Sequence, residues 1–138
     1  MDDMIRPCFL VVDRETSSAI STRKLIIETA KFNVITAYSS KEAIETLKKY
    51  PALDGVVTDS GMTDMPCSDL IDALKDLQPK IPIVVICTPR GSQCDRADHV
   101  LESFNPKALL GLLQSLHPDA TAEIEKRNEL LEEGYYKH

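Results

Sequence analysis

Short apolar runs alternate along the chain with segments of helical spacing, and this alternation restricts the fold more than any other feature. The apolar runs predict strands over residues 8–12, 32–37, 53–59, 81–87 and 99–101. The segments between and after them predict helices over residues 17–30, 40–50, 68–77 and 105–116. Uninterrupted apolar strands are typical of a parallel sheet that is covered on both faces. We therefore expect an α/β fold with a doubly wound five-stranded parallel sheet.

The alternation breaks between the fourth and fifth predicted strands. Residues 89–97 contain Pro89 and Gly91 and almost no apolar periodicity. A helix of average length with two connecting loops does not fit into this segment. We expect a loop or a single turn, so that the fourth helix of the alternating pattern is shortened or missing.

Capping residues refine two of the helix boundaries. Ser40 is the predicted cap of the second helix, and Pro51 ends that helix. After Pro118, Asp119 can cap an extra C-terminal helix, which is strongly charged. We expect a sheet domain over residues 1–118 and a helical extension over residues 119–138 that either pairs between subunits or docks on the domain.

Length and charge exclude several classes of protein. The chain has 138 residues, the usual size of one domain, and a formal net charge of -6. The negative charge argues against broad electrostatic binding to nucleic acid or to anionic membranes. The apolar runs are far shorter than the ~20 residues of a membrane span, and the N-terminus lacks the pattern of a secretory signal. We expect a cytoplasmic protein whose partners are proteins or small ions.

The cysteines and histidines do not form a metal-binding pattern. The four cysteines include no Cys-x-x-Cys pair, and the three histidines are scattered singly. We expect reduced, mostly buried thiols and no structural zinc. The cysteines are Cys8, Cys67, Cys87 and Cys94.

Polar residues follow the predicted strands at the edge where ligands bind in such sheets. Asp13 and Arg14 follow the first strand, Asp59 ends the third, Cys87 and Thr88 close the fourth, and Glu102 follows the fifth. Carboxylates at several strand ends predict a magnesium site, because Mg²⁺ prefers a few carboxylate oxygens with water. The alternative is that each aspartate only caps the turn that follows it, and spacing alone does not separate the two.

Three segments together resemble the receiver domain of two-component response regulators. They are Phe9-Leu-Val-Val-Asp13, Val56-Val-Thr-Asp-Ser-Gly-Met62 and Pro82-Ile-Val-Val-Ile-Cys-Thr88. The likeness spans about residues 7 to 117. It implies a flavodoxin-like fold, a phosphoacceptor at Asp59 and Mg²⁺ held by Asp13 and Asp59. It also implies, as partners, a sensor histidine kinase or phosphotransfer protein and a downstream protein.

Several positions depart from the family pattern. Arg14 stands where the family has a second acidic residue, and Glu102 stands where it has a lysine. Cys87 replaces the hydroxyl residue at the end of the fourth strand, with Thr88 one place later. The aromatic switch position falls on His99. We expect Asp13, Arg14 and Glu102 to surround Asp59 in one acidic crevice.

These departures change the expected metal chemistry. At about 4 Å from Asp59, the Arg14 guanidinium would attract that carboxylate by about 4 kcal/mol at an effective dielectric constant of about 20. Arg14 would then weaken the binding of Mg²⁺. In an alternative arrangement, Glu102 acts as a third metal ligand with Asp13 and Asp59.

Three functions are compatible with the sequence. The first is a phosphorelay receiver that is phosphorylated on Asp59, weakly because of the departures. The second is a pseudo-receiver that binds proteins without phosphorylation. The third, a small flavodoxin-like enzyme, has little support because the chain has no Gly-rich phosphate loop and no nucleophile elbow. We therefore expect no enzyme, and we expect any homodimer to differ from the family's usual one because residues 89–97 are short.

Overall fold

The five predicted strands are present and form one parallel sheet. A computed structural model of the protein describes residues 6–13, 22–87, 94, 96–102 and 105–116. The strand order is β2-β1-β3-β4-β5, and every neighbouring pair is parallel. The strands are β1 (Cys8–Val12), β2 (Asn33–Ala37), β3 (Gly55–Asp59), β4 (Ile83–Ile86) and β5 (His99–Leu101). This topology confirms the predicted doubly wound α/β fold of the flavodoxin-like type.

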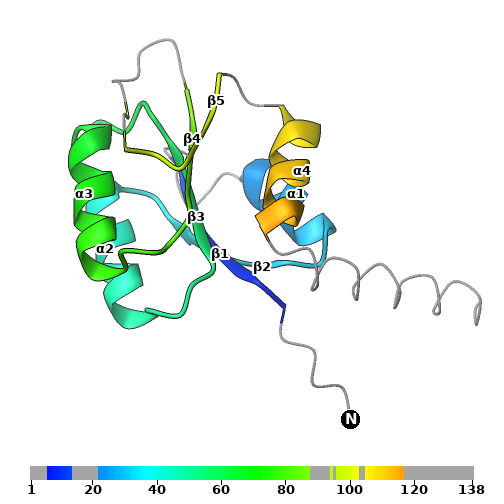
Figure 1. Cartoon of the computed structure of the whole chain (residues 1–138), viewed down its shortest axis with the longest axis horizontal. Helices are drawn as coiled ribbons and strands as arrows, with labels where there is room; N and C mark the ends of the chain where they lie inside the picture. The colour runs from blue at the N-terminus through cyan, green and yellow to red at the C-terminus, as the bar shows by residue number, and fades with distance from the viewer. Residues whose placement is uncertain (1–5, 14–21, 88–93, 95, 103–104, 117–138) are drawn as a thin grey trace, which may run out of the picture.

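Helices cover both faces of the sheet. Two of them lie on one side and two on the other, with the strands between them (Figure 1). The first pair is α2 (Ser40–Lys49) and α3 (Cys67–Leu77), and the second pair is α1 (Thr22–Thr29) and α4 (Pro106–Leu116). Within the described residues, no helix is long and apolar enough to cross a membrane. The predicted extension over residues 119–138 lies outside the described residues.

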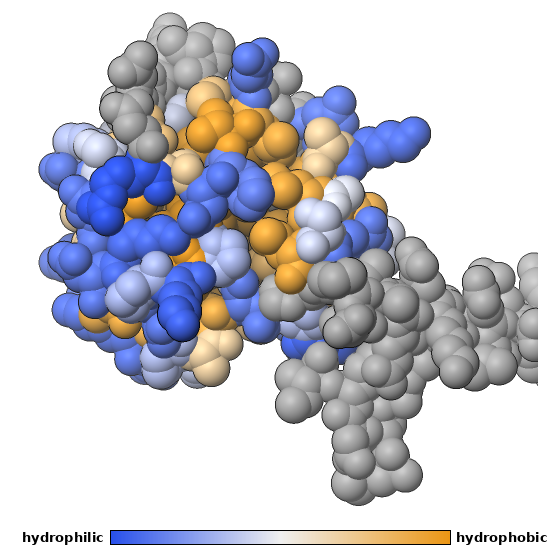
Figure 2. All heavy atoms as spheres, viewed as in Figure 1, coloured by the Kyte–Doolittle hydropathy of each residue, from blue (hydrophilic) through white to orange (hydrophobic). Residues whose placement is uncertain are grey.

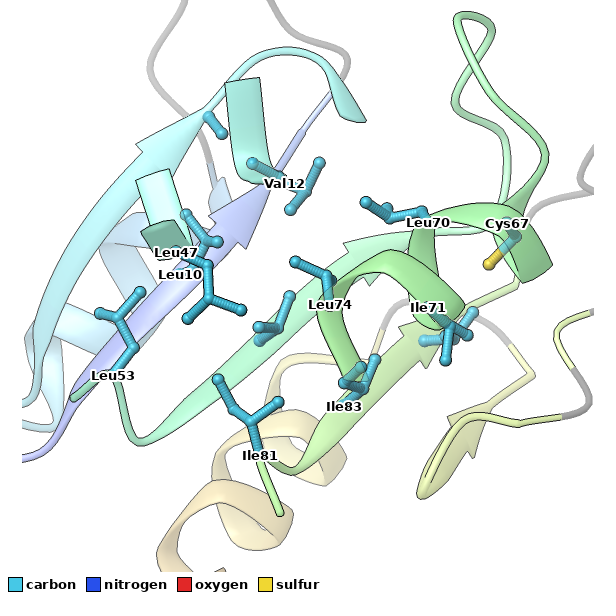
Figure 3. Packing of buried hydrophobic residues seen from close by; sticks show 14 residues of the cluster. Leu10, Val12, Leu47, Leu53, Cys67, Leu70, Ile71, Leu74, Ile81 and Ile83 are labelled. Carbon is cyan, nitrogen blue, oxygen red and sulfur yellow. The ribbon is translucent and has the colours of Figure 1, made fainter. Parts of the chain in front are cut away.

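Two hydrophobic clusters follow from the alternation of side chains along the strands. Leu10 and Val12 of β1 point into the cluster under α2 and α3, which Figure 3 shows from close by. Phe9 and Val11 point into the opposite cluster, where Leu113 of α4 is also buried. Both faces of β1 and β3 are therefore buried, as the uninterrupted apolar runs predict.

The start of α2 corrects one prediction. Ser39 is the N-cap, because its backbone is extended and its Oγ accepts a hydrogen bond from the Glu42 N–H at 3.0 Å. Ser40, the predicted cap, is already the first residue of the helix and is buried. Two adjacent serines offer the same signal, and only the backbone conformation distinguishes them.

No helix is present in the described part of the connection between β4 and β5. This part, which we call the strap, comprises Cys94, Arg96, Ala97 and Asp98. It lies against α3, to which it is joined by a disulfide and two ion pairs. Figure 1 shows it passing from α3 towards β5. The prediction that no full helix fits here agrees with the described residues, and residues 88–93 and 95 lie outside them.

The strap leaves part of β5 open to solvent. Val100 pairs with Val85, so its side chain points to the face that α2 and α3 cover elsewhere, yet it is 50% exposed. On the side of the molecule shown in Figure 2, hydrophobic residues gather around β5 and the neighbouring α4.

Candidate functional site

The strand register brings Asp13 and Asp59 to the same level of the sheet. Val12 is paired with Thr58, so the residues that follow them, Asp13 and Asp59, lie at corresponding positions on adjacent strands. Alternation places both side chains on the sheet face that carries α1 and α4. The two aspartates predicted as the centre of the site are therefore neighbours at the carboxyl edge of β1 and β3.

Asp59 is a buried carboxylate in a defined orientation. It is the last residue of β3 and is only 3% exposed. Its Oδ1 accepts a hydrogen bond from the Gly61 N–H at 3.0 Å. This bond to the residue two places later is an Asx-type turn, which fixes the rotation of the carboxylate at the start of the following loop.

Asp13 is also buried. The backbone around the site is held by hydrogen bonds that continue the ladders of hydrogen bonds between neighbouring strands. Asp13 is 1% exposed, and its N–H donates to the Ala37 carbonyl at 2.9 Å. Ser60 N–H donates to the Ile86 carbonyl at 3.0 Å, and Cys87 N–H donates to the Leu101 carbonyl at 2.8 Å. The ladders thus continue one residue past the strands, which makes the platform under Asp59 rigid.

The structure does not place Glu102 with the two aspartates in a metal-binding group. Glu102 is exposed after β5, and β4 separates that strand from β3. Among the described residues, no group of three or more His, Cys, Asp or Glu side chains could hold a metal ion. The described residues form no such group with Glu102, so the alternative in which Glu102 is a third metal ligand is wrong for them.

The other predicted pocket residues are distributed differently. Cys87 is half-buried and directly follows β4. Asp59 pairs with Ile86, so Cys87 lies one residue further along the strand direction than Asp59. His99 is half-buried and pairs with Val84. It is the first residue of β5, two residues before the carboxyl end of the strand. Arg14 and Thr88 lie outside the described residues. Asp13 and Asp59 thus lie next to each other, whereas Cys87 lies one residue past β4 and His99 lies further down the sheet.

A carboxylate that the sequence analysis did not single out anchors the loop that follows Asp59. Asp64 Oδ1 accepts a hydrogen bond from the Ser40 N–H, and Oδ2 accepts one from the Lys41 N–H, both at 3.1 Å. These two N–H groups belong to the first turn of α2, where a helix has no internal acceptors and favours a negative charge. Burial on its own would raise the pKa of Asp64, but the backbone N–H groups of Lys41 and Ser40 lower it.

The cysteines correct a second prediction. Cys67 and Cys94 form a disulfide with a Cα–Cα distance of 5.5 Å, so the expectation of four reduced thiols is wrong. Cys8 and Cys87 are free. Burial, followed by the nearby carboxylate of Asp54, raises the pKa of the Cys8 thiol and makes it a poor nucleophile.

The two buried carboxylates are chemically suited to a hard divalent cation. Mg²⁺ is usually held by one or two carboxylates with water completing its shell, which matches the number of acids at this edge. Asp13 and Asp59 come from adjacent strands at the same level, and both are nearly inaccessible to solvent. Two like charges in this environment are costly unless a cation or hydrogen bonds balance them.

Comparisons with known proteins agree with this arrangement. Residues 9–104 match the family model of the response regulator receiver domain. No curated protein sequence matches the chain. A solved receiver domain protein from Clostridium thermocellum is similar, at 21% identity and a TM-score of 0.66, over 91% of this chain and 98% of that chain.

Two further solved structures share the fold. A CheY-like receiver domain protein from Methanospirillum hungatei JF-1 is 18% identical with a TM-score of 0.70, over 89% of this chain and 99% of that chain. The chemotaxis protein CheY4 of Vibrio cholerae, crystallised at low pH, is 23% identical with a TM-score of 0.66, over 81% of this chain and 99% of that chain. At these identities, the likeness shows the fold.

Proposed function

The chain belongs to the response regulator receiver domain family, and on this premise we propose that it accepts a phosphoryl group on Asp59 in a two-component phosphorelay. The observation that carries the proposal is the position of Asp59, which ends β3 beside Asp13 with its Oδ1 held by the Gly61 N–H. A sensor histidine kinase or a phosphotransfer protein is the proposed donor. A downstream protein is the proposed reader of the phosphorylated state.

The transfer requires the carboxylate of Asp59 to act as the nucleophile. One of its oxygens attacks the phosphorus atom, the bond from phosphorus to the donor atom breaks, and the donor leaves with the electron pair. The product is an acyl phosphate on Asp59. Positioning dominates the rate of such transfers. The hydrogen bond from Gly61 N–H to Oδ1 and the rigid ladder around Ser60 supply that positioning.

Asp13 and Asp59 are the residues that would hold Mg²⁺. When bound, this ion neutralises negative charge on the oxygens of the transferred group. Without a third acidic ligand from the described residues, water would fill most of its coordination shell. We therefore propose weak binding of Mg²⁺, and Arg14, which follows Asp13 in the sequence, would weaken it further by its charge.

The proposal is tested by incubating the full chain with MgCl₂ and a small phosphodonor such as acetyl phosphate. The expected result is a mass gain of one phosphoryl group, which peptide mapping assigns to Asp59. The Asp59→Asn variant should show no gain. Asp54→Asn is the matched control, because Asp54 lies just before the opposite end of β3, where its Oδ2 accepts the Cys8 N–H at 2.8 Å. This variant should be phosphorylated like the wild type.

The competing function is a pseudo-receiver that binds its partner without phosphorylation. Absence of a phosphoryl gain with small donors and with a cognate kinase would refute phosphorylation of Asp59 and favour this alternative. In that case, Asp59→Asn should retain the partner in a pull-down. Loss of the partner in the variant, together with a phosphoryl gain in the wild type, supports the phosphorelay function.

A further inference from the structure

The strap contacts α3 at every second residue. The strap contains a turn, because the Ala97 N–H donates to the Cys94 carbonyl at 3.3 Å. The contacts run from the first residue of α3 into its last turn. The contacting pairs are Cys94–Cys67, Arg96–Asp72 and Asp98–Lys75. The strap therefore follows the length of the helix, and a covalent bond joins the two at one end.

The two ends of the strap are held differently. The Asp98 carboxylate accepts hydrogen bonds from Lys75 Nζ at 2.7 Å and from Ile83 N–H at 2.8 Å, and the Asp98 N–H donates to the Ile83 carbonyl at 3.0 Å. The Arg96 ion pair in the middle is about half exposed on both sides and contributes little. The Asp98 end thus stays attached without the disulfide, whereas the disulfide is the covalent attachment of the Cys94 end.

The two sulfur atoms have complementary environments. Cys94 is half-buried and therefore more exposed than Cys67, which is 2% exposed and lies in the apolar cluster under α2 and α3. Cys67 is also the first residue of α3, after Pro66, which provides no side-chain cap. The N-terminus of the helix favours a thiolate at Cys67, and burial opposes it. Cys94 is thus the sulfur that an external thiol or disulfide reaches first, with Cys67 as its partner within the protein.

We propose that Cys67 and Cys94 are a thiol–disulfide exchange site whose substrates are a low-molecular-weight disulfide and the corresponding thiol. The Cys94 thiolate attacks the small disulfide, forms a mixed disulfide and expels one thiolate. The Cys67 thiolate then attacks the Cys94 sulfur, closes the bond within the protein and expels the second thiolate. Two protein thiols are oxidised, and one small disulfide is reduced to two thiols that take up the two protons.

The exchange controls how the strap is attached to α3. In the oxidised state the bond joins the Cys94 end to the start of the helix, next to the loop that leads from Asp59. In the reduced state the strap remains attached through the Asp98 contacts, the packing of Ala97 and the exposed Arg96–Asp72 ion pair, and its Cys94 end loses its covalent bond. This inference goes beyond the receiver function and does not require phosphorylation of Asp59.

The test equilibrates the folded full chain with mixtures of reduced and oxidised glutathione, quenches with acid and alkylates free thiols with N-ethylmaleimide. Intact mass should show two added groups in oxidising mixtures, on Cys8 and Cys87, and four in reducing mixtures, with a single step between them. Reduction should also accelerate hydrogen exchange at Ala97, whose N–H donates to the Cys94 carbonyl, but not at Ile83.

Variants separate the proposed pair from the other thiols. Cys94→Ser should carry three N-ethylmaleimide groups in every mixture. The matched control Cys87→Ser should still show the redox step, from one group in oxidising mixtures to three in reducing mixtures. Asp59→Asn should keep the step unchanged, which separates this inference from the phosphorelay. Three results would each overturn the proposal. The first is four N-ethylmaleimide groups in every mixture, and the second is two groups even in excess reductant. The third is a stable glutathione adduct in place of the intramolecular disulfide.

Discussion

Replacing Gly55 with alanine should destabilise the protein, because the first position of β3 has no room for a methyl group. A Cβ there would lie 2.9 Å from both Cδ1 and Cε1 of Phe9, the residue paired with Gly55 across β1 and β3. Carbon atoms pack at about 3.5–4.0 Å. The ring cannot move aside easily, because Phe9 is fully buried and packs against Phe32 with the ring centroids 5.5 Å apart.

The magnitude follows from two opposing effects. Overpacking of a filled core costs about 1–3 kcal/mol. Gly55 does not have a positive φ, so alanine is compatible with the backbone. Alanine also lowers the conformational entropy of the unfolded chain, which stabilises the folded state by about 0.4–1 kcal/mol. We expect a net loss of about 1–2 kcal/mol in the free energy of unfolding. For a chain of this length, that loss lowers Tm by about 3–7 °C.

Urea unfolding followed by circular dichroism measures this loss. Gly111→Ala is the matched control, because a Cβ at this exposed position in α4 has no neighbour within 4 Å. This variant should gain about 0.5–1 kcal/mol from helix propensity. In a double-mutant cycle, Phe9→Leu should partly relieve the clash at residue 55. Equal or higher stability of Gly55→Ala would refute the packing argument.

Two further predictions concern a helix cap and an ion pair. Ser39→Ala should reduce the free energy of unfolding by about 1 kcal/mol in urea, because it removes the hydrogen bond from the Glu42 N–H to Ser39 Oγ. Ser40→Ala keeps this capping bond and should cost less. The reverse order would show that the cap is misassigned. Burial alone would raise the pKa of Asp98, but the hydrogen bond from Lys75 and the Ile83 N–H lower it below the unfolded value of about 3.9. The stabilisation from Asp98 is therefore complete above about pH 4 and is lost as the pH falls through the lowered pKa. Unfolding measured against pH should lose this acid-dependent step in Asp98→Asn, and an unchanged profile would contradict the assignment.

The strands and the central aspartates were predictable because their signals are local. An apolar run such as residues 8–12 becomes a strand wherever it lies in the chain, and the following Asp13 must then lie at the sheet edge. The pairing of Asp13 with Asp59 follows once β1 and β3 are neighbours. Both aspartates are buried at that edge.

Contacts between distant segments were not predictable in the same way. Cys67 and Cys94 are separated by 27 residues, and they meet only because the strap runs along α3 in place of a helix. Nothing in the local sequence of Asp64 indicates that it reaches the start of α2. Glu102 was expected as an alternative third metal ligand because it follows a strand, but the described residues form no such group.

The carboxylate of Asp64 makes two parts of the molecule mechanically dependent on each other. Its oxygens accept hydrogen bonds from the Ser40 and Lys41 N–H groups. The loop that carries Asp64 therefore cannot shift outward unless water replaces the carboxylate at these N–H groups. A displacement of the loop that follows Asp59 would therefore break these two hydrogen bonds and expose the start of α2 to water. If Asp59 accepts a phosphoryl group as proposed, a protein that binds the start of α2 would detect the position of the loop without contacting it.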